Sequence, residues 1–215
     1  MNRGIVHFKG LYALRFLAAF PIIIYHATAG FHASMTPTVK LFFQNLVIGV
    51  DLFFLISGFL IIYLLLLEKK DTGSIQMGKF YLRRILRIFP LYFLIVGLAY
   101  LVYHPGHPDV NFSKYLYFWG NFYTIELNNW PVGFLTPLWS ICIEEHFYLI
   151  IPFLVLITPL RLVHWVLIGV IIASMVYRYA QVPTDNWFTI YCHSLSRCDL
   201  MAVGGLLHLL SKRIF

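Results

Sequence analysis

Residues 46–67, LVIGVDLFFLISGFLIIYLLLL, decide the fold class of this chain. The stretch has 22 residues and one formally charged side chain, Asp51. A helix that crosses the hydrocarbon core of a bilayer needs about 20 predominantly apolar residues. The stretch is therefore predicted to be a membrane-spanning helix that carries a carboxylate within it.

The rest of the chain has the same apolar character. Of its 215 residues, 60% are hydrophobic and 12% are charged, whereas soluble domains average about 25% charged residues. Long apolar runs predict six spans, over about 11–29, 41–67, 85–103, 138–159, 162–180 and 197–210. The fold class is therefore predicted to be all-α, a polytopic transmembrane helix bundle that forms a single domain over residues 1–215.

The net charge is +7, and the basic residues cluster between the apolar runs. This distribution indicates how the chain is oriented in the membrane and does not indicate nucleic-acid binding. The basic residues between the second and third predicted spans are Lys69, Lys70, Lys79, Arg83, Arg84 and Arg87. This loop is predicted to be cytoplasmic, and Arg3 and Lys9 place the N-terminus on the same side. The loop 104–137 has a single Lys or Arg, Lys114, and is predicted to be external.

Metal binding is not predicted. The external loop contains His104, His107 and Asp109, whose side chains can bind metals, but loops rich in proline and glycine often carry histidines without a metal. The three cysteines of the chain fit no metal-ligand spacing. The lipid bilayer is the environment that the composition implies.

Ionisable residues inside the predicted spans are the candidate functional residues, because a charge near the bilayer centre costs at least ~2.5–3.5 kcal/mol. Arg15 and His26 lie 11 residues apart in the first span. At ~100° and 1.5 Å per residue, they share one helical face and are ~16 Å apart along the axis. Arg15 is thus predicted near the inner side and His26 near the outer side. Taken singly, Arg15 is also compatible with an arginine that extends to the membrane interface, and His26 with a histidine that bonds to a neighbour in the core.

Acidic residues are predicted inside two further spans. Asp51 is expected to accept a hydrogen bond from His26 or from an arginine, or to act as a structural tie between helices. Glu144 and Glu145 are adjacent, point ~100° apart on a helix and are expected to serve different partners. Arg197, at the outer end of the sixth span, is compatible with a substrate entrance and with an ordinary interface residue.

Five segments, in the same order, resemble the bacterial integral-membrane acyltransferase family 3. They are LRFLAA at 14–19 with His26, GVDLFFLISGFL at 49–60, FYLRRILRIFPLY at 80–92, LWSICIEEHFYL at 138–149, and SRCD at 196–199 with Gly204-Gly205. Each segment alone is a modest signal. Together they cover nearly the whole chain, and the chain is identified as a member of this family.

The resemblance implies an O-acyltransferase of the bacterial inner (cytoplasmic) membrane. Such a protein moves an acyl group, usually acetyl, from cytoplasmic acyl-CoA to a hydroxyl of a carbohydrate, another cell-envelope acceptor or a small molecule. The family motifs fall on the following residues: arginine–ten residues–histidine on Arg15 and His26, arginine–two residues–arginine on Arg84 and Arg87, and Trp-Ser…Glu on Trp139, Ser140 and Glu144.

We expect His26 to act as general base on the acceptor hydroxyl, since the ordinary pKa of histidine is about 6.5. Glu144 or Asp51 is expected to fix the tautomer of His26 and to stabilise its imidazolium form. Two sets of residues are expected to bind the substrates: Arg15, Arg84 and Arg87 the phosphates of acyl-CoA, and Trp139, Ser140, Glu145 and Arg197 the acceptor.

Two features depart from the family pattern. His146 stands where the family usually has glutamine, and family members have more spans than the six predicted here. The C-terminal helices that would complete the bundle are thus expected to be missing, and a homo-oligomer or a separate C-terminal half is a candidate partner. The alternatives to an active enzyme are an inactive truncated remnant and a proton- or ion-coupled transporter. The sequence shows no inverted repeat of the kind on which many transporters are built, which argues against the transporter.

Overall fold

The computed structural model describes residues 9–31 and 35–214, and all regular elements in these ranges are helices. The α-helices are α1 (Lys9–Thr28), α2 (Pro37–Asn45), α3 (Ile48–Thr72), α4 (Met77–Tyr103), α5 (Ser113–Leu116), α6 (Gly120–Leu127), α7 (Leu138–Ile157), α8 (Val163–Gln181), α9 (Trp187–Cys192) and α10 (Ser194–Ile214). Short 3-10 segments lie at Ala29–Phe31, Gly133–Leu135, Leu160–Leu162 and Val182–Thr184. The predicted all-α fold class is confirmed, while Arg3 lies outside the described residues.

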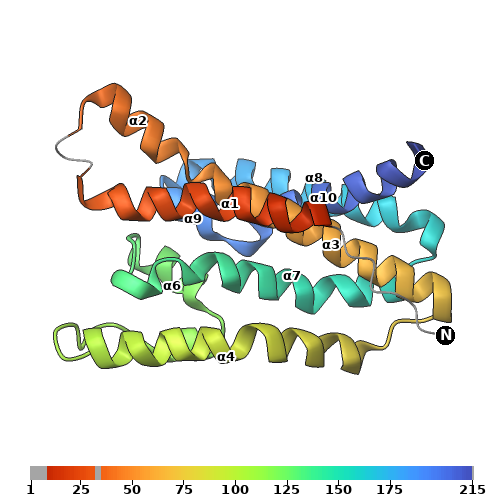
Figure 1. Ribbon diagram of the computed structural model, residues 1–215, viewed down its shortest axis with the longest axis horizontal. Helices are drawn as coiled ribbons and strands as arrows, with labels where there is room; N and C mark the ends of the chain where they lie inside the picture. The colour runs from red at the N-terminus through yellow and green to blue at the C-terminus, as the bar shows by residue number, and fades with distance from the viewer. Residues whose placement is uncertain (1–8, 32–34, 215) are drawn as a thin grey trace.

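The long helices α1, α3, α4, α7, α8 and α10 run along the long axis of the molecule and alternate in direction (Figure 1). As a result, α1 starts at the end of the bundle where α10 finishes, and the turn from α3 to α4 lies at that end too. The segment 104–137 lies at the opposite end (Figure 1). Which end faces the cytoplasm stays a prediction from the basic residues.

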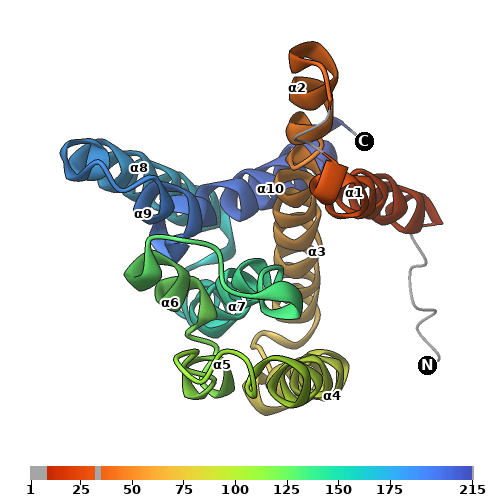
Figure 2. The same cartoon turned by 90° about the vertical axis from the view of Figure 1, so that its left-hand side faces the viewer.

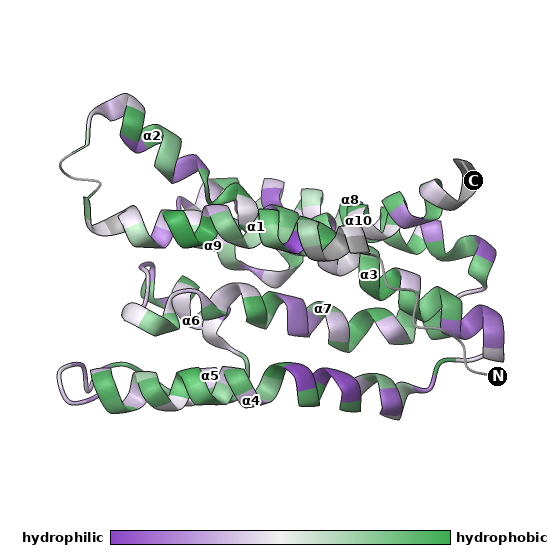
Figure 3. Cartoon of the chain, viewed as in Figure 1, coloured by the Kyte–Doolittle hydropathy of each residue, from purple (hydrophilic) through white to green (hydrophobic). Residues whose placement is uncertain are grey.

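Among the described residues, four segments are long and apolar enough to cross a membrane, judged by length and composition: Pro37–Thr72, Met77–Tyr103, Gly133–Ile157 and Leu160–Thr184. Helix α1 contributes a shorter apolar stretch, Ala13–Thr28. Figure 3 shows hydrophobic residues along most of the long helices, with hydrophilic residues gathered in the first half of α4 and in the middle of α7. The number of six spans stays a prediction.

The second predicted span, 41–67, is not one continuous helix. Helix α2 ends at Asn45 and α3 begins at Ile48, so a turn at Leu46 and Val47 separates them. None of the residues of α2 is buried, and the helix leans away from the bundle (Figures 1 and 2). Helix α2 contacts α1 but buries none of its residues there, so the packing of α2 against the described part of the bundle is slight.

Helix α3 lies at the centre of the bundle and packs against α1, α7 and α10. Its contact with α10 is a close crossing of two backbones. A Cβ atom on Gly58 would collide with the backbone of Met201, and one on Gly204 would collide with the backbone of Leu55. Glycine at these two positions is therefore what permits α3 and α10 to approach this closely.

The far end of α3 also fixes α7. The Nζ atom of Lys69 lies 2.8, 2.7 and 2.7 Å from the carbonyl oxygens of Val155, Leu156 and Thr158. The last carbonyl groups of a helix have no partner within the helix and carry partial negative charge, so a cation there is stabilising. Helices α3 and α7 are thus held in a fixed register, which positions the site between them.

Helix α4 is attached to the bundle through a hydrophobic cluster that includes Tyr92, Tyr115, Leu135 and Cys142. The buried hydroxyl of Tyr92 donates to the carbonyl oxygen of Tyr115 at 2.9 Å. Nearer the other end of α4, the hydroxyl of Tyr81 donates to the carbonyl oxygen of Leu149 in α7, also at 2.9 Å. These two bonds bring the basic first half of α4 beside the middle of α7.

Candidate functional site

The middle of α7 carries the acid at the centre of the candidate site, Glu144. Its Oε1 accepts a hydrogen bond from Ser57 Oγ of α3 at 3.0 Å, and its Oε2 accepts one from Tyr148 Oη at 3.0 Å. Arg15 of α1 and Arg84 of α4 both lie within electrostatic range of this carboxylate. One partly buried acid thus connects groups from α1, α3, α4 and α7.

Glu144 borders a cavity of about 280 Å³ between α1, α3 and α7. Ser140 lines the same cavity, and α1 contributes Ile22 to its wall. Arg15 and His26 stand seven residues before and four residues after Ile22, so they lie on the same face of α1. His26 itself is exposed. The predicted shared face of Arg15 and His26 is thus the face of α1 that borders the cavity.

Asp51 pairs with an arginine. Its Oδ1 lies 3.1 Å from the guanidinium of Arg197 in α10, and that guanidinium also lies over the ring of Tyr191, 4.3 Å from the centroid. Of the two partners expected for Asp51, the structure shows the arginine. Within the described residues, neither Asp51 nor Glu144 is hydrogen-bonded or ion-paired to His26, so their action on His26 stays a prediction.

Glu145 faces a different cavity, of about 350 Å³, between α4 and α7. Arg84, His146 and Tyr148 are among its lining residues. The Oε1 atom of Glu145 and the Nε atom of Arg84 are buried and have no hydrogen-bond partner among the described residues. A buried polar atom without a partner costs about 1–3 kcal/mol. These two atoms are therefore ready to bond to a polar ligand.

The arginines predicted to bind the donor line a third cavity, of about 580 Å³, at the end of the bundle where α3 leads into α4. Arg84 and Arg87 lie there together with Arg83, and Glu68 and Asp71 are on the opposite wall. Arg84 lines both this cavity and the one that contains Glu145. The structure brings Arg84 and Arg87 together, while Arg15 lies on α1, on the side of Glu144.

The predicted acceptor residues Trp139 and Ser140 have different surroundings. Trp139 is 5% exposed and packs its ring against Phe54 and Tyr191, at centroid distances of 6.2 and 4.9 Å. It therefore belongs to the hydrophobic core. Ser140 donates to the carbonyl oxygen of Pro137 at 3.0 Å and borders the Glu144 cavity. Within the residues described, no group of three or more His, Cys, Asp or Glu side chains could hold a metal ion.

The sequence analysis missed Ser194, which lines a fourth cavity, and Asn121, which is buried beside it. Ser194 Oγ lies 2.6 Å from His146 Nδ1 and 3.0 Å from Asn121 Nδ2. These contacts join α6, α7 and the start of α10, across 48 and 73 positions of sequence. No local pattern marks them, because serine and asparagine at helix starts usually serve as caps.

Comparison with known proteins gives a consistent set of relatives. A family profile described as "Acyltransferase domain" matches residues 8–214. A protein of Staphylococcus aureus (strain COL), provisionally named an O-acetyltransferase, is 34% identical over 167 residues, which are 72% of this chain and 25% of that protein. The peptidoglycan O-acetyltransferase OatA of Listeria monocytogenes serovar 1/2a is 32% identical over 162 residues, 67% of this chain and 23% of the relative.

A third relative, the O-acetyltransferase OatA of Staphylococcus aureus (strain NCTC 8325), is 30% identical over 160 residues, which cover 69% of this chain and 25% of that protein. The chain therefore spans about a quarter of the length of the curated relatives it matches. No solved structure matches it.

Proposed function

Since this chain belongs to the integral-membrane acyltransferase family whose profile covers residues 8–214, we propose that it transfers an acyl group, acetyl in the simplest case, from acyl-CoA to a hydroxyl of a cell-envelope carbohydrate or small molecule. The proposed setting is the bacterial inner membrane, with the donor on the cytoplasmic side. The observation that carries the proposal is the Glu144 site, an acid held among hydroxyl and guanidinium groups inside an apolar bundle. Ionisable groups at this depth are costly and indicate function.

The donor is proposed to bind where the arginines of α4 lie. Guanidinium groups bind phosphate oxygens with two parallel hydrogen bonds, and Arg84 and Arg87 line the cavity of about 580 Å³ at one end of the bundle. Because Arg84 also borders the cavity between α4 and α7, the arm that carries the thioester can pass beside it toward the middle of α7.

The acceptor hydroxyl is proposed to lose its proton to His26, whose face of α1 borders the Glu144 cavity. The acceptor oxygen then attacks the thioester carbonyl, the carbon–sulfur bond breaks, and the CoA thiolate leaves with a proton from the imidazolium. The negative charge of Glu144 stabilises the imidazolium across the cavity. Asp51 holds Arg197 in place on the acceptor side through the 3.1 Å ion pair.

The test is a transfer assay on the purified chain in lipid vesicles, with labelled acetyl-CoA and a glycan acceptor. His26→Ala is expected to lower the rate by at least about 100-fold, the usual contribution of a general base. His164→Ala, a change at the start of α8 away from the Glu144 cavity, is the matched control and is expected to keep the rate. Transfer by His26→Ala at the full rate would remove His26 from the mechanism.

A further inference from the structure

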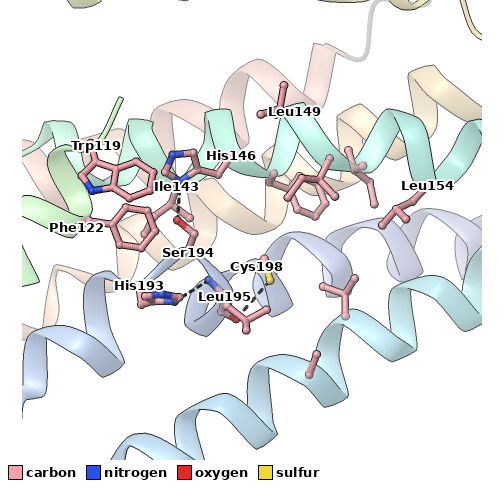
Figure 4. Close-up of a pocket in the computed structure, with 15 residues that line it drawn as sticks. Trp119, Phe122, Ile143, His146, Leu149, Leu154, His193, Ser194, Leu195 and Cys198 are labelled. Atoms are coloured by element: carbon pink, nitrogen blue, oxygen red, sulfur yellow. Dashed lines mark hydrogen bonds between the residues drawn. The ribbon is translucent and has the colours of Figure 1, made fainter. Parts of the chain in front are cut away.

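The fourth cavity, of about 400 Å³, lies between α6, α7, α8 and α10, on another side of α7 from the Glu144 site. Most of its wall is apolar, and the chain supplies Ile143, Phe147, Ile151, Leu154 and Val170 along α7 and α8. Polar side chains meet at one end of it, where His146 and Ser194 point toward each other (Figure 4). The volume is within the range of ~300–1,000 Å³ typical of small-molecule sites.

The contacts of Asn121 determine which group donates in its hydrogen bond to Ser194. Asn121 is completely buried, and its Nδ2 lies 3.1 Å from the carbonyl oxygen of Cys192 and 3.0 Å from Ser194 Oγ. A carbonyl oxygen can only accept, so the amide NH₂ group must face Cys192. The same NH₂ group therefore donates to Ser194 Oγ, which acts as an acceptor in this contact.

The Asn121 bond uses one acceptor position of Ser194 Oγ, and in the Nε2–H tautomer of His146 the hydroxyl proton of Ser194 is directed at Nδ1. Ser194 Oγ accepts from Asn121, and its other hydrogen-bond partner among the described residues is His146 Nδ1, at 2.6 Å. The backbone of Phe118 also lies beside the His146 ring, where it favours one orientation of the imidazole. A hydroxyl that donates to an imidazole, which in turn is oriented by a third group, is the arrangement of an activated nucleophile.

We propose that Ser194 and His146 are a nucleophile and base that take an acyl group with a hydrocarbon chain from an acyl thioester. The proposal rests on the proposed function for its donor. His146 Nδ1 accepts the proton of Ser194, and Oγ attacks the thioester carbonyl. The carbon–sulfur bond breaks, and the thiolate leaves with that proton. The product is an acyl-Ser194 ester whose chain lies in the apolar cavity.

The ester is then passed to an acceptor hydroxyl. His146 Nδ1 takes the proton of the acceptor, the acceptor oxygen attacks the ester carbonyl, and Ser194 Oγ leaves and regains a proton from His146. The pair is a property of this chain, because His146 stands where the resemblance predicts glutamine. A glutamine side chain can bond to Ser194 Oγ but cannot accept its proton.

The pair can be tested without any acyl-CoA, using an octyl fluorophosphonate on the purified chain in lipid nanodiscs. This reagent phosphonylates serine oxygens that have a base, with release of fluoride. Mass spectrometry of the peptides is expected to find the adduct on Ser194. His146→Gln keeps a hydrogen-bonding group and is expected to react at least about 100-fold more slowly. Ser174→Ala, on α8, is the control and is expected to react at the wild-type rate.

Two results overturn the proposal: no adduct on Ser194 in the wild-type chain, or equal rates for the wild type and a folded His146→Gln variant. A shorter ethyl fluorophosphonate is expected to react more slowly than the octyl reagent, and equal rates remove the chain-binding role of the cavity. Failure of the proposed function looks different. In that case acyl transfer from acyl-CoA is absent while the fluorophosphonate still labels Ser194.

Discussion

Glu144 and Glu145 are neighbours in α7, but their carboxylates are in opposite situations. Glu144 accepts hydrogen bonds from Ser57 and Tyr148, whereas Glu145 has a buried oxygen without a partner among the described residues. The rotation of ~100° between adjacent helical residues turns one acid toward α1 and α3 and the other toward α4. One turn of α7 thus presents a bonded acid to one cavity and an available acid to another.

The largest effect is expected when the helix that holds Glu144 is displaced. Gly58→Leu puts a side chain into the backbone of Met201, so α3 must move and take Ser57 away from Glu144. Overpacking typically costs about 1–3 kcal/mol and more where backbone must move, so a reduced yield of folded protein is expected in size-exclusion chromatography. Gly97→Leu is the matched control, because nothing lies within 4 Å of a Cβ there. Equal yields of folded protein would contradict the close crossing of α3 and α10.

The next effect separates the two acids directly. Glu144→Ala leaves the hydroxyls of Ser57 and Tyr148 without their acceptor, at about 1 kcal/mol or more each. Glu145→Ala removes an oxygen that has no partner and is expected to leave the free energy of unfolding nearly unchanged. Unfolding of both variants in detergent should therefore differ by about 2 kcal/mol. The contrast between the acids fails if Glu145→Ala is equally destabilised.

A smaller effect is expected from one bond of Glu144. Ser57→Ala removes the Ser57 hydroxyl but leaves the Tyr148 bond, so a loss of about 1 kcal/mol is expected. Ser140→Ala is a suitable control, because the Ser140 hydroxyl donates to a carbonyl at the start of its own helix. Thermal unfolding in the same detergent compares the two. A larger loss of stability in Ser140→Ala than in Ser57→Ala would show that the Ser57–Glu144 bond is not the one that stabilises α7.

The smallest effect on stability is expected at the available acid. Glu145→Gln keeps the size of the side chain and is expected to change the free energy of unfolding by less than about 0.5 kcal/mol. It removes the charge that faces the cavity between α4 and α7, where the thioester arm is proposed to meet the acceptor, so KM for the acceptor is expected to rise with little change in kcat. Unchanged kinetics would show that Glu145 does not bind the acceptor.

The positions of the long apolar helices could be predicted from the sequence, because a helix in a bilayer needs about 20 predominantly apolar residues. The span predicted at 138–159 is helix α7, Leu138–Ile157. The same argument failed at the start of α3. The apolar run continues through Leu46 and Val47, so nothing in it marks the turn between α2 and α3.

The candidate site could be predicted only as a set of residues. The motifs located Arg15, Asp51 and Glu144, but their partners depend on how the helices cross. The sequence predicts either His26 or an arginine as the partner of Asp51, and Arg197 is beside it because α10 crosses α3 through Gly58 and Gly204. The Ser57–Glu144 bond joins residues 87 positions apart, which no helical period can indicate.

The glycine crossing of α3 and α10 also sets the order in which the protein can mature. Helix α3 leaves the ribosome long before Gly204 has been synthesised, so its small-residue face enters the lipid without the partner that will cover it. Small residues on a membrane helix attract other helices. A nascent chain that has inserted α3 but not yet α10 therefore exposes, at Gly58, a backbone surface against which other membrane helices can pack.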